Sequence, residues 1–215
     1  MSSLRKRAGD EIDSETVPLF RWVSRPIRGL GQANAAALSA AARGTAHHRF
    51  IELADIAQLT TLAGAQSEAQ RLESLGLLSP EEVTALDLEA ITRFWQASLG
   101  RRILANTGNI IRELEFTARF SADDIRGLGV PVKPGIGPDE FVVVQGIVDL
   151  VVILDNALWI VDFKTDDVEK PELELKVQAY RPQLMAYGKA LGRIYRRPVT
   201  EMWIHFLALN TSVAL

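Results

Sequence analysis

The sequence has no cysteine among its 215 residues. This absence excludes disulfide bonds, thiolate zinc sites and cysteine-bound iron–sulfur clusters. It also fits a reducing compartment, and we expect the protein in the cytoplasm. The chain likewise lacks an apolar run near the roughly 20 residues that a membrane helix needs, and Met1 does not begin a secretory signal. No membrane partner is therefore expected.

The sequence also lacks a strong excess of either charge. The formal net charge is −3, which argues against a protein that coats DNA through bulk positive charge but leaves room for a local basic patch. Several catalytic motifs are missing as well: the phosphate-binding GxxxxGK[ST] loop, the Rossmann glycine fingerprint, the GxSxG elbow and the HExxH zinc motif. Chemistry that depends on those motifs is therefore not expected.

The hydrophobic pattern divides the chain into three parts. Residues 1–32 are charged and interrupted by proline and glycine, which predicts an arm or linker. Residues 33–105 are mainly helical, and residues 106–215 combine strands with one long helix. We therefore expect a single domain over 33–215, of the α/β class, with a central mixed sheet flanked by helices and a helical portion at its N-terminal end.

Three helical segments are predicted. The first covers 33–65 and is interrupted at Gly44, so that it forms two helices or one with a break. The second starts at the Ser-Pro pair of Ser79 and continues to about residue 104, because serine caps a helix and proline fits its first turn. The third covers about 179–194. It places five side chains on one face, which are Tyr180, Leu184, Tyr187, Leu191 and Ile194.

Alternating or continuous apolar runs predict four strands, at 111–120, 141–154, 157–164 and 202–209. In the first of them, alternation places Glu113 on the same side as Glu115 and Thr117. The second and third are separated by a short polar turn, so they form a hairpin.

Two acidic residues and a lysine interrupt the apolar strands of this hairpin. Asp149 lies in one strand, Asp162 follows it by 13 residues, and Lys164 shares a strand face with Asp162. An unpaired charge on a buried strand is costly, so these residues form a buried ion pair or a functional site, and spacing alone favours neither. Carboxylates hold Mg²⁺ or Mn²⁺ and a lysine can steady an attacking water, which is the chemistry of metal-assisted phosphodiester hydrolysis.

Two further features have more than one interpretation. His47 and His48 lie in the first helical segment, and His48 falls opposite its apolar stripe, but periodicity does not tell which histidine has a functional role. From Lys176 to Arg197 the chain has six basic residues and no acidic one. Such a run is typical of a solvated face, or of a surface that contacts phosphates.

Five motifs, in this order, resemble those of one nuclease family. Gly44–His48 reads GTAHH and resembles GTxxH, and Arg112–Phe116 reads RELEF and resembles an ExPF strand in which glutamate replaces the usual proline. Gly146–Asp149 resembles GxiD, Asp162–Thr165 resembles DyKT, and Tyr180–Tyr187 resembles YxxQLxxY. Together they make the chain similar to the RecB-type branch of the PD-(D/E)xK nucleases, most of all to the C-terminal nuclease domain of AddA-type helicase–nucleases.

This resemblance implies a restriction-endonuclease-like fold and DNA cleavage with Mg²⁺, or with Mn²⁺, and the lack of cysteine matches the branch that has no iron–sulfur cluster. By matched position, the metal ligands would be His48, Asp149, Asp162 and the main-chain carbonyl of Phe163. Catalytic roles would fall to Asp149, Asp162, Lys164, Gln183 and Tyr187. Substrate contacts would come from Tyr180 and Arg181, and Glu113 would support the metal ligands.

The same resemblance implies partners and a process. Members of this type process broken DNA ends for recombination behind a helicase. We therefore expect DNA as substrate and a helicase motor as partner, in the same parent chain or as a separate subunit, with residues 1–32 as the remnant of a tether. The expected function is a metal-dependent exonuclease module in double-strand-break repair.

Two alternatives to this function stay open. One is a non-catalytic module on the same fold that binds DNA or docks a partner, and the other is an RNA-processing nuclease. The presence of Asp149, Asp162 and Lys164 favours an active module, because buried charges without a function would only cost stability.

Overall fold

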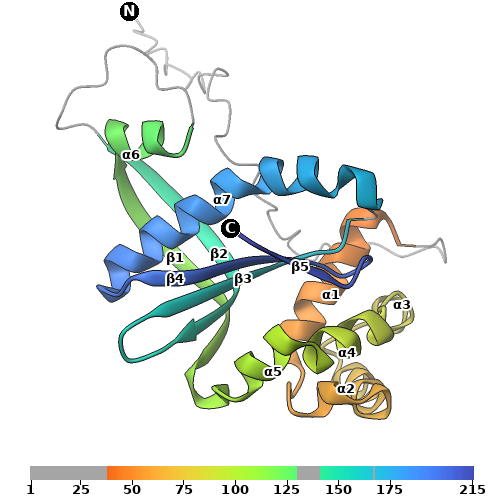
Figure 1. Cartoon of the computed structure of the whole chain (residues 1–215). Coiled ribbons are helices and arrows are strands. Elements are labelled where there is room, and N and C mark those ends of the chain that lie inside the picture. The colour runs from red at the N-terminus through yellow and green to blue at the C-terminus, as the bar shows by residue number, and fades with distance from the viewer. Residues whose placement is uncertain (1–37, 130–140, 167) are drawn as a thin grey trace, which may run out of the picture.

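The fold is a five-stranded sheet between two layers of helices (Figure 1). The computed structural model describes residues 38–129, 141–166 and 168–215, and the arm predicted at 1–32 lies outside them. The mixed sheet flanked by helices confirms the α/β, restriction-endonuclease-like architecture predicted from the sequence. In the part of the chain that the structure describes, no helix combines the length and apolarity needed to cross a membrane.

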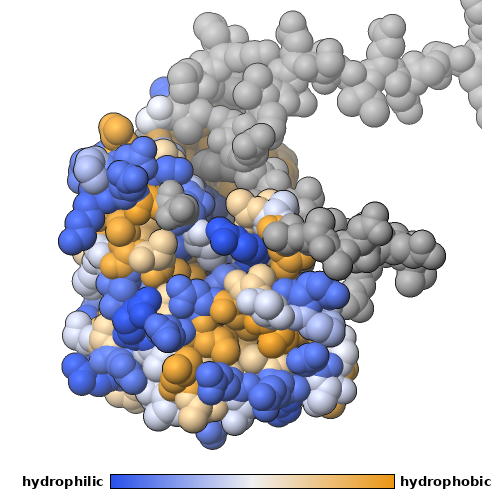
Figure 2. Space-filling model, turned by 90° about the vertical axis from the view of Figure 1, so that its right-hand side faces the viewer, coloured by the Kyte–Doolittle hydropathy of each residue, from blue (hydrophilic) through white to orange (hydrophobic). Residues whose placement is uncertain are grey.

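Within the described residues, five helices precede the first strand and form one layer. They are α1 (Ala40–Leu53), α2 (Leu62–Ser74), α3 (Pro80–Thr84), α4 (Leu88–Gln96) and α5 (Ser98–Leu104). Phe94 and Trp95 of α4 are buried and pack in one core with Phe163 of the sheet. On the side of the molecule where these helices lie, apolar residues gather in the lower half, between hydrophilic ones (Figure 2).

The sheet follows the order of the chain. Its strands are β1 (Ile110–Ser121), β2 (Phe141–Ile153), β3 (Leu158–Lys164), β4 (Val199–Phe206) and β5 (Thr211–Ala214). All neighbouring strands pair antiparallel except β3 and β4.

A parallel pair needs a long crossover, which α7 (Leu173–Tyr195) supplies. Helix α7 covers the other face of the sheet, where Leu191 packs with Val148 and Ile160. A short helix, α6 (Ala122–Gly127), follows β1.

The predicted break at Gly44 is wrong, because α1 runs without interruption through that residue. The glycine is required by packing instead. A Cβ atom at Gly44 would lie 2.9 Å from the Thr165 side-chain oxygen, at the end of β3. The next residue, Thr45, satisfies its hydroxyl within the helix by donating to the carbonyl of Ala41. Gly44 therefore lets α1 approach the end of β3, which brings the first and the fourth motif into contact.

The second predicted helix begins where the sequence places it but is divided into three. Ser79 accepts the N–H of Glu82, and Glu82 accepts the N–H of Ser79, so the predicted capping motif is confirmed. The chain leaves the helical conformation after α3 and again at Ala97, whose ψ is 166°. Helix α5 then folds back closely on α4, since a Cβ atom at Gly100 would lie 2.2 Å from the Phe94 carbonyl oxygen. Tertiary packing thus overrides a continuous helical pattern.

Helix α7 starts at Leu173, earlier than the predicted residue 179. Its predicted inner face is confirmed for Leu184, Tyr187 and Leu191, which are buried. It is wrong for Ile194, which lies in the last turn of the helix and is 49% exposed.

Candidate metal centre and active site

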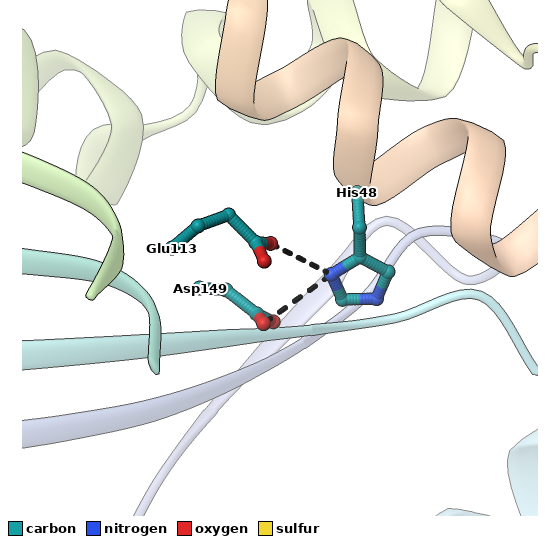
Figure 3. Close-up of side chains that lie close together, drawn as sticks. All are labelled: His48, Glu113 and Asp149. Atoms are coloured by element: carbon teal, nitrogen blue, oxygen red, sulfur yellow. Dashed lines mark ion pairs between the residues drawn. The ribbon is translucent and has the colours of Figure 1, made fainter. Parts of the chain in front are cut away.

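Three side chains from three different elements meet at one edge of the helical layer. His48 comes from α1, Glu113 from β1 and Asp149 from β2, and one potential ligand atom from each lies within 4.8 Å of the others (Figure 3). The Nδ1 atom of His48 lies 3.3 Å from Asp149 Oδ1 and 3.7 Å from Glu113 Oε1. An imidazole and two carboxylates that converge in this way are a donor set for a divalent cation.

The charges of this cluster are strongly coupled. Burial lowers the pKa of His48, but the neighbouring Asp149 and Glu113 outweigh that effect and raise it to about 10. Burial conversely raises the pKa of Asp149, and the adjacent His48 brings it below its usual value. The cluster is therefore an ion pair of one imidazolium with two carboxylates. A divalent cation would supply the same positive charge and would compete with the proton on His48.

The neighbouring histidine has a structural role that the sequence could not reveal. His47 Nδ1 donates to the carbonyl of Arg43 at 2.7 Å, and Nε2 accepts the backbone N–H of Asp87 at 2.9 Å. Burial lowers the pKa of His47, so the ring is neutral. Both ring nitrogens are thus used: Nδ1 holds the ring within α1, and Nε2 joins α1 to the start of α4. Of the two histidines, only His48 faces the carboxylates.

Glu113 occupies a backbone conformation that the predicted alternation does not allow for. Its φ is +48°, in the left-handed region that residues other than glycine rarely adopt. Before it, Ile110 packs on the core of the first helices, whereas Leu114 packs on the core under α7. The side-chain alternation of β1 therefore reverses at Glu113: even-numbered residues face the first helices before it and α7 after it. The Glu113 carboxylate turns toward His48 of α1, whereas Glu115, predicted on the same side of the strand, is exposed.

The partner strand changes faces at the opposite position. Leu150 of β2 belongs to the core of the first helices, but Val148, two residues away, belongs to the core under α7. The strand register places Glu113 opposite Asp149, between the paired positions Arg112–Leu150 and Leu114–Val148. Arg112 holds this point of β1 against α1 by donating to the carbonyls of Ile51 and Ala54, at 2.8 and 2.5 Å. Tertiary structure thus brings together the two carboxylates that flank His48.

Asp162 and Lys164 lie beside this cluster on β3. Their side chains share a face with Leu158 and Ile160, as predicted, and the Lys164 ammonium lies 2.8 Å from Asp162 Oδ2. Apart from this ion pair, the buried Asp162 Oδ2 has no hydrogen-bond partner among the residues that the structure describes. Burial raises the pKa of Asp162 to about 6. The charge of this buried carboxylate is therefore balanced at Oδ2 by the Lys164 ammonium.

Phe163 connects the two halves of the site. Its backbone N–H donates to Asp149 Oδ2 at 2.6 Å, which fixes the Asp149 carboxylate against β3. Its ring is buried in the core and lies edge-on to Phe94, with ring centroids 4.9 Å apart. The ligand role of its main-chain carbonyl stays a prediction.

Two further predicted catalytic residues, Gln183 and Tyr187, lie on α7 and face the sheet. Gln183 Nε2 donates to the Tyr187 hydroxyl at 2.6 Å, and Tyr187 is almost completely buried. The Tyr187 ring meets Phe116 edge-on, with centroids 5.5 Å apart. Both rings lie directly over Gly146, where a Cβ atom would come within 2.6 Å of Phe116 and 2.9 Å of Tyr187. The GxiD and YxxQLxxY motifs are thus in direct contact.

Replacing Gly146 with alanine should therefore destabilise the protein. The added methyl group must displace two packed aromatic rings, and overpacking of this kind costs about 1–3 kcal/mol of the free energy of unfolding. Denaturant unfolding measures the loss. Gly108→Ala is the matched control, because a Cβ atom there meets nothing within 4 Å. Equal stability changes in the two variants would contradict this packing role.

The basic run from Lys176 to Arg197 mainly stabilises the fold. Lys189 and Arg193 both pair with Asp124 at the start of α6, Lys176 pairs with Asp166, and Arg197 donates to a backbone carbonyl. Within the described residues, only Arg181 and Arg196 of the six have no such partner. A phosphate-contacting surface over the whole run is therefore not favoured, whereas a substrate contact by Arg181 stays a prediction.

The chain is similar to several known proteins over most of its length. The model of the PD-(D/E)XK nuclease superfamily matches residues 19–212. An ATP-dependent helicase/nuclease subunit from Moorella thermoacetica is 34% identical over 170 residues, which cover 79% of this chain and 12% of that protein. Proteins of the same name are 30% identical over 218 residues in Lacticaseibacillus paracasei and 31% identical over 190 residues in Bacillus mycoides. Those alignments cover 98% and 82% of this chain, but only 17% and 14% of those proteins.

Proposed function

The chain belongs to the PD-(D/E)XK nuclease superfamily, and from this membership we propose that it is a metal-dependent nuclease that hydrolyses phosphodiester bonds of DNA. One observation carries the proposal. The His48–Glu113–Asp149 cluster adjoins a buried Asp162–Lys164 pair, so acidic ligands and a lysine converge on one place. Relatives that share at least 30% identity are named as helicase/nuclease subunits, which supports DNA as the substrate.

The residues present fit a divalent cation. Magnesium and manganese prefer carboxylate oxygens. Among the described residues, the polar partner of the buried Asp162 Oδ2 is the Lys164 ammonium, a positive charge whose place a cation would take. We propose His48, Asp149 and Asp162 as ligands, with the Phe163 carbonyl. Glu113 joins them as a candidate ligand rather than a supporting residue, because its carboxylate faces the same Nδ1 atom as Asp149.

The bound cation would supply Lewis acidity to the scissile phosphate. The protein contributes the rest of the chemistry. Asp149 and Asp162 hold fixed negative charges in a buried place, and the hydrogen bond from the Phe163 N–H keeps Asp149 oriented. The two carboxylates outweigh the burial of Lys164 and raise its pKa, so its ammonium keeps its charge where it can steady an attacking water or the developing negative charge.

The finer assignment also belongs to this proposal. We infer an exonuclease module that acts at DNA ends during double-strand-break repair and works with a helicase motor, in one parent chain or as a separate subunit. The chain spans less than a fifth of the length of the relatives named above, and their printed name joins a helicase to a nuclease. We also propose, from the sequence, that the domain covers residues 33–215 and that the protein lies in the cytoplasm.

Cleavage of linear DNA by the purified chain tests this function. We expect single- or double-stranded DNA to be degraded in Mg²⁺ or Mn²⁺ and left intact in EDTA, since the carboxylate cluster needs a cation to act. RNA of the same sequence, cleaved faster than DNA, would support the RNA-processing alternative instead. A chain that binds Mg²⁺ in calorimetry without cleaving would depend on its motor. A chain that neither binds metal nor cleaves would be a non-catalytic module.

A further inference from the structure

The Lys164 ammonium has a second contact besides Asp162. It lies over the face of the Tyr180 ring, 4.2 Å from the ring centroid. A lysine stem is flexible and its ammonium is a point charge without directional preference, so such contacts decide where the charge is held. A cation is attracted to an aromatic face, and the attraction is stronger when the pair is shielded from water. The Lys164 side chain is only 15% exposed, so this contact belongs to the stronger kind.

The Tyr180 ring is itself fixed from two sides. Its hydroxyl donates to Asp166 Oδ2, and the same carboxylate oxygen lies 3.2 Å from the Lys176 ammonium. Its ring lies beside Phe206 of β4, with centroids 6.4 Å apart, and packs on the small core at the start of α7. The hydroxyl and the ring face that a DNA-contacting tyrosine would offer to its substrate are therefore occupied within the protein.

From these contacts we propose that Asp166 and Tyr180 form a clamp that positions Lys164 for the cleavage reaction. Tyr180 is then a positioning residue instead of the substrate contact expected from its motif, and Asp166 acts through Tyr180. This inference rests on the proposed nuclease function, since it assigns Lys164 a catalytic task.

The clamp solves a problem that the ion pair creates. Asp162 Oδ2 is the atom that the Lys164 ammonium contacts, and it is also the atom that the proposed function gives to a cation. If Asp162 Oδ2 held a cation, Lys164 would lose its nearest anionic partner. The ring face of Tyr180, held by Asp166, keeps the ammonium beside the site instead of releasing it to solvent.

Kinetics of four variants test the clamp. At saturating Mg²⁺ and DNA, Asp166→Ala and Tyr180→Leu should each lower kcat about tenfold, the scale of one lost cation–π contact. The KM for DNA and the Mg²⁺ affinity should not change.

The double variant should be no slower than Tyr180→Leu, because Asp166 acts through Tyr180. Asp166→Asn should restore activity, since its amide oxygen still accepts from the Tyr180 hydroxyl. A raised KM with unchanged kcat in Tyr180→Leu would overturn the clamp in favour of a DNA contact.

A second readout does not need cleavage. Acetic anhydride labels accessible amines, and mass spectrometry gives the rate for each lysine. Lys164 should be labelled several times faster in Asp166→Ala and Tyr180→Leu than in the unchanged protein, while Lys189, held by Asp124, keeps its rate. Asp123→Ala, which removes an exposed carboxylate of α6, is the matched control. An unchanged Lys164 rate would overturn the clamp even in an active nuclease. An altered Lys164 rate in a chain that neither binds Mg²⁺ nor cleaves DNA would refute the nuclease assignment while the contact between Lys164 and Tyr180 stands.

Discussion

Replacing Asp162 with asparagine should abolish metal-dependent cleavage while the protein stays folded. The Asp162 carboxylate is buried, and among the described residues the polar partner of its Oδ2 atom is the Lys164 ammonium. Asparagine keeps the shape of the side chain but removes the charge that a hard divalent cation requires. Loss of charge stabilisation at a reacting centre lowers turnover by about a hundredfold to a thousandfold, and loss of the cation would add to this. Single-turnover cleavage of end-labelled DNA in Mg²⁺ measures the effect.

The stability of the same variant separates a functional charge from a structural one. Two effects oppose each other in Asp162→Asn. The variant removes a buried carboxylate whose pKa is raised to about 6 by burial, which favours folding at neutral pH, but it leaves Lys164 with one partner fewer. The melting temperature in EDTA should therefore change little. Asp123→Asn, an exposed carboxylate, serves as the control for both activity and melting. A variant that unfolds at room temperature, or that cleaves at the normal rate, would show that Asp162 is a structural ion pair.

The layer architecture and half of the site followed from local sequence patterns. The strands β2 and β3 were visible as apolar runs, and their charged residues were visible because charge is rare in such runs. The two-residue period of a strand correctly placed Asp162 and Lys164 on one face. The capping motif at Ser79 was equally local and is present. Patterns of this kind are predictable because neighbouring residues alone determine them.

The conformation and the neighbours of Glu113 cannot be predicted from local patterns of this kind. Its role depends on a positive φ and on an exchange of strand faces opposite Asp149, and neither leaves a mark in the alternation of β1. A left-handed conformation costs a glutamate on the order of 1–3 kcal/mol, so the surrounding structure must impose it. The contacts of Arg112 with the end of α1 are part of that structure. Only the resemblance to a nuclease motif drew attention to Glu113 from the sequence.

The glycines of the motifs also depend on contacts that the local sequence does not reveal. Gly44 looked like a helix break because glycine weakens helices, but its reason lies in Thr165, far along the chain. Gly146 looked like an ordinary strand residue, although two aromatic rings from β1 and α7 require its small size. In both cases the residue is explained by a partner in another motif. Motifs that lie far apart in the sequence are therefore in contact in the fold.

Variants of the two adjacent histidines of α1 should distinguish a residue that binds metal from one that stabilises the fold. His48→Ala should lower the affinity for Mn²⁺ by more than about a hundredfold, because even residues that only support a ligand contribute 10–100-fold. His47→Ala should leave that affinity unchanged. It should instead cost about 2–3 kcal/mol of the free energy of unfolding, since it removes two buried hydrogen bonds and leaves the Asp87 N–H unpaired.

Unfolding with and without Mn²⁺ resolves the two variants in one experiment. A ligand that binds only the folded state raises the free energy of unfolding in proportion to the logarithm of the ratio of ligand concentration to dissociation constant. His47→Ala should therefore start from a lower free energy of unfolding in EDTA but keep the full increment on adding Mn²⁺. His48→Ala also loses stability in EDTA, because Glu113 and Asp149 then face each other without the imidazolium, yet it should gain almost nothing from the metal. If both variants kept the increment, His48 would be a partner of the carboxylates alone, and the cation would have to be held by Asp149, Asp162 and Glu113 without an imidazole.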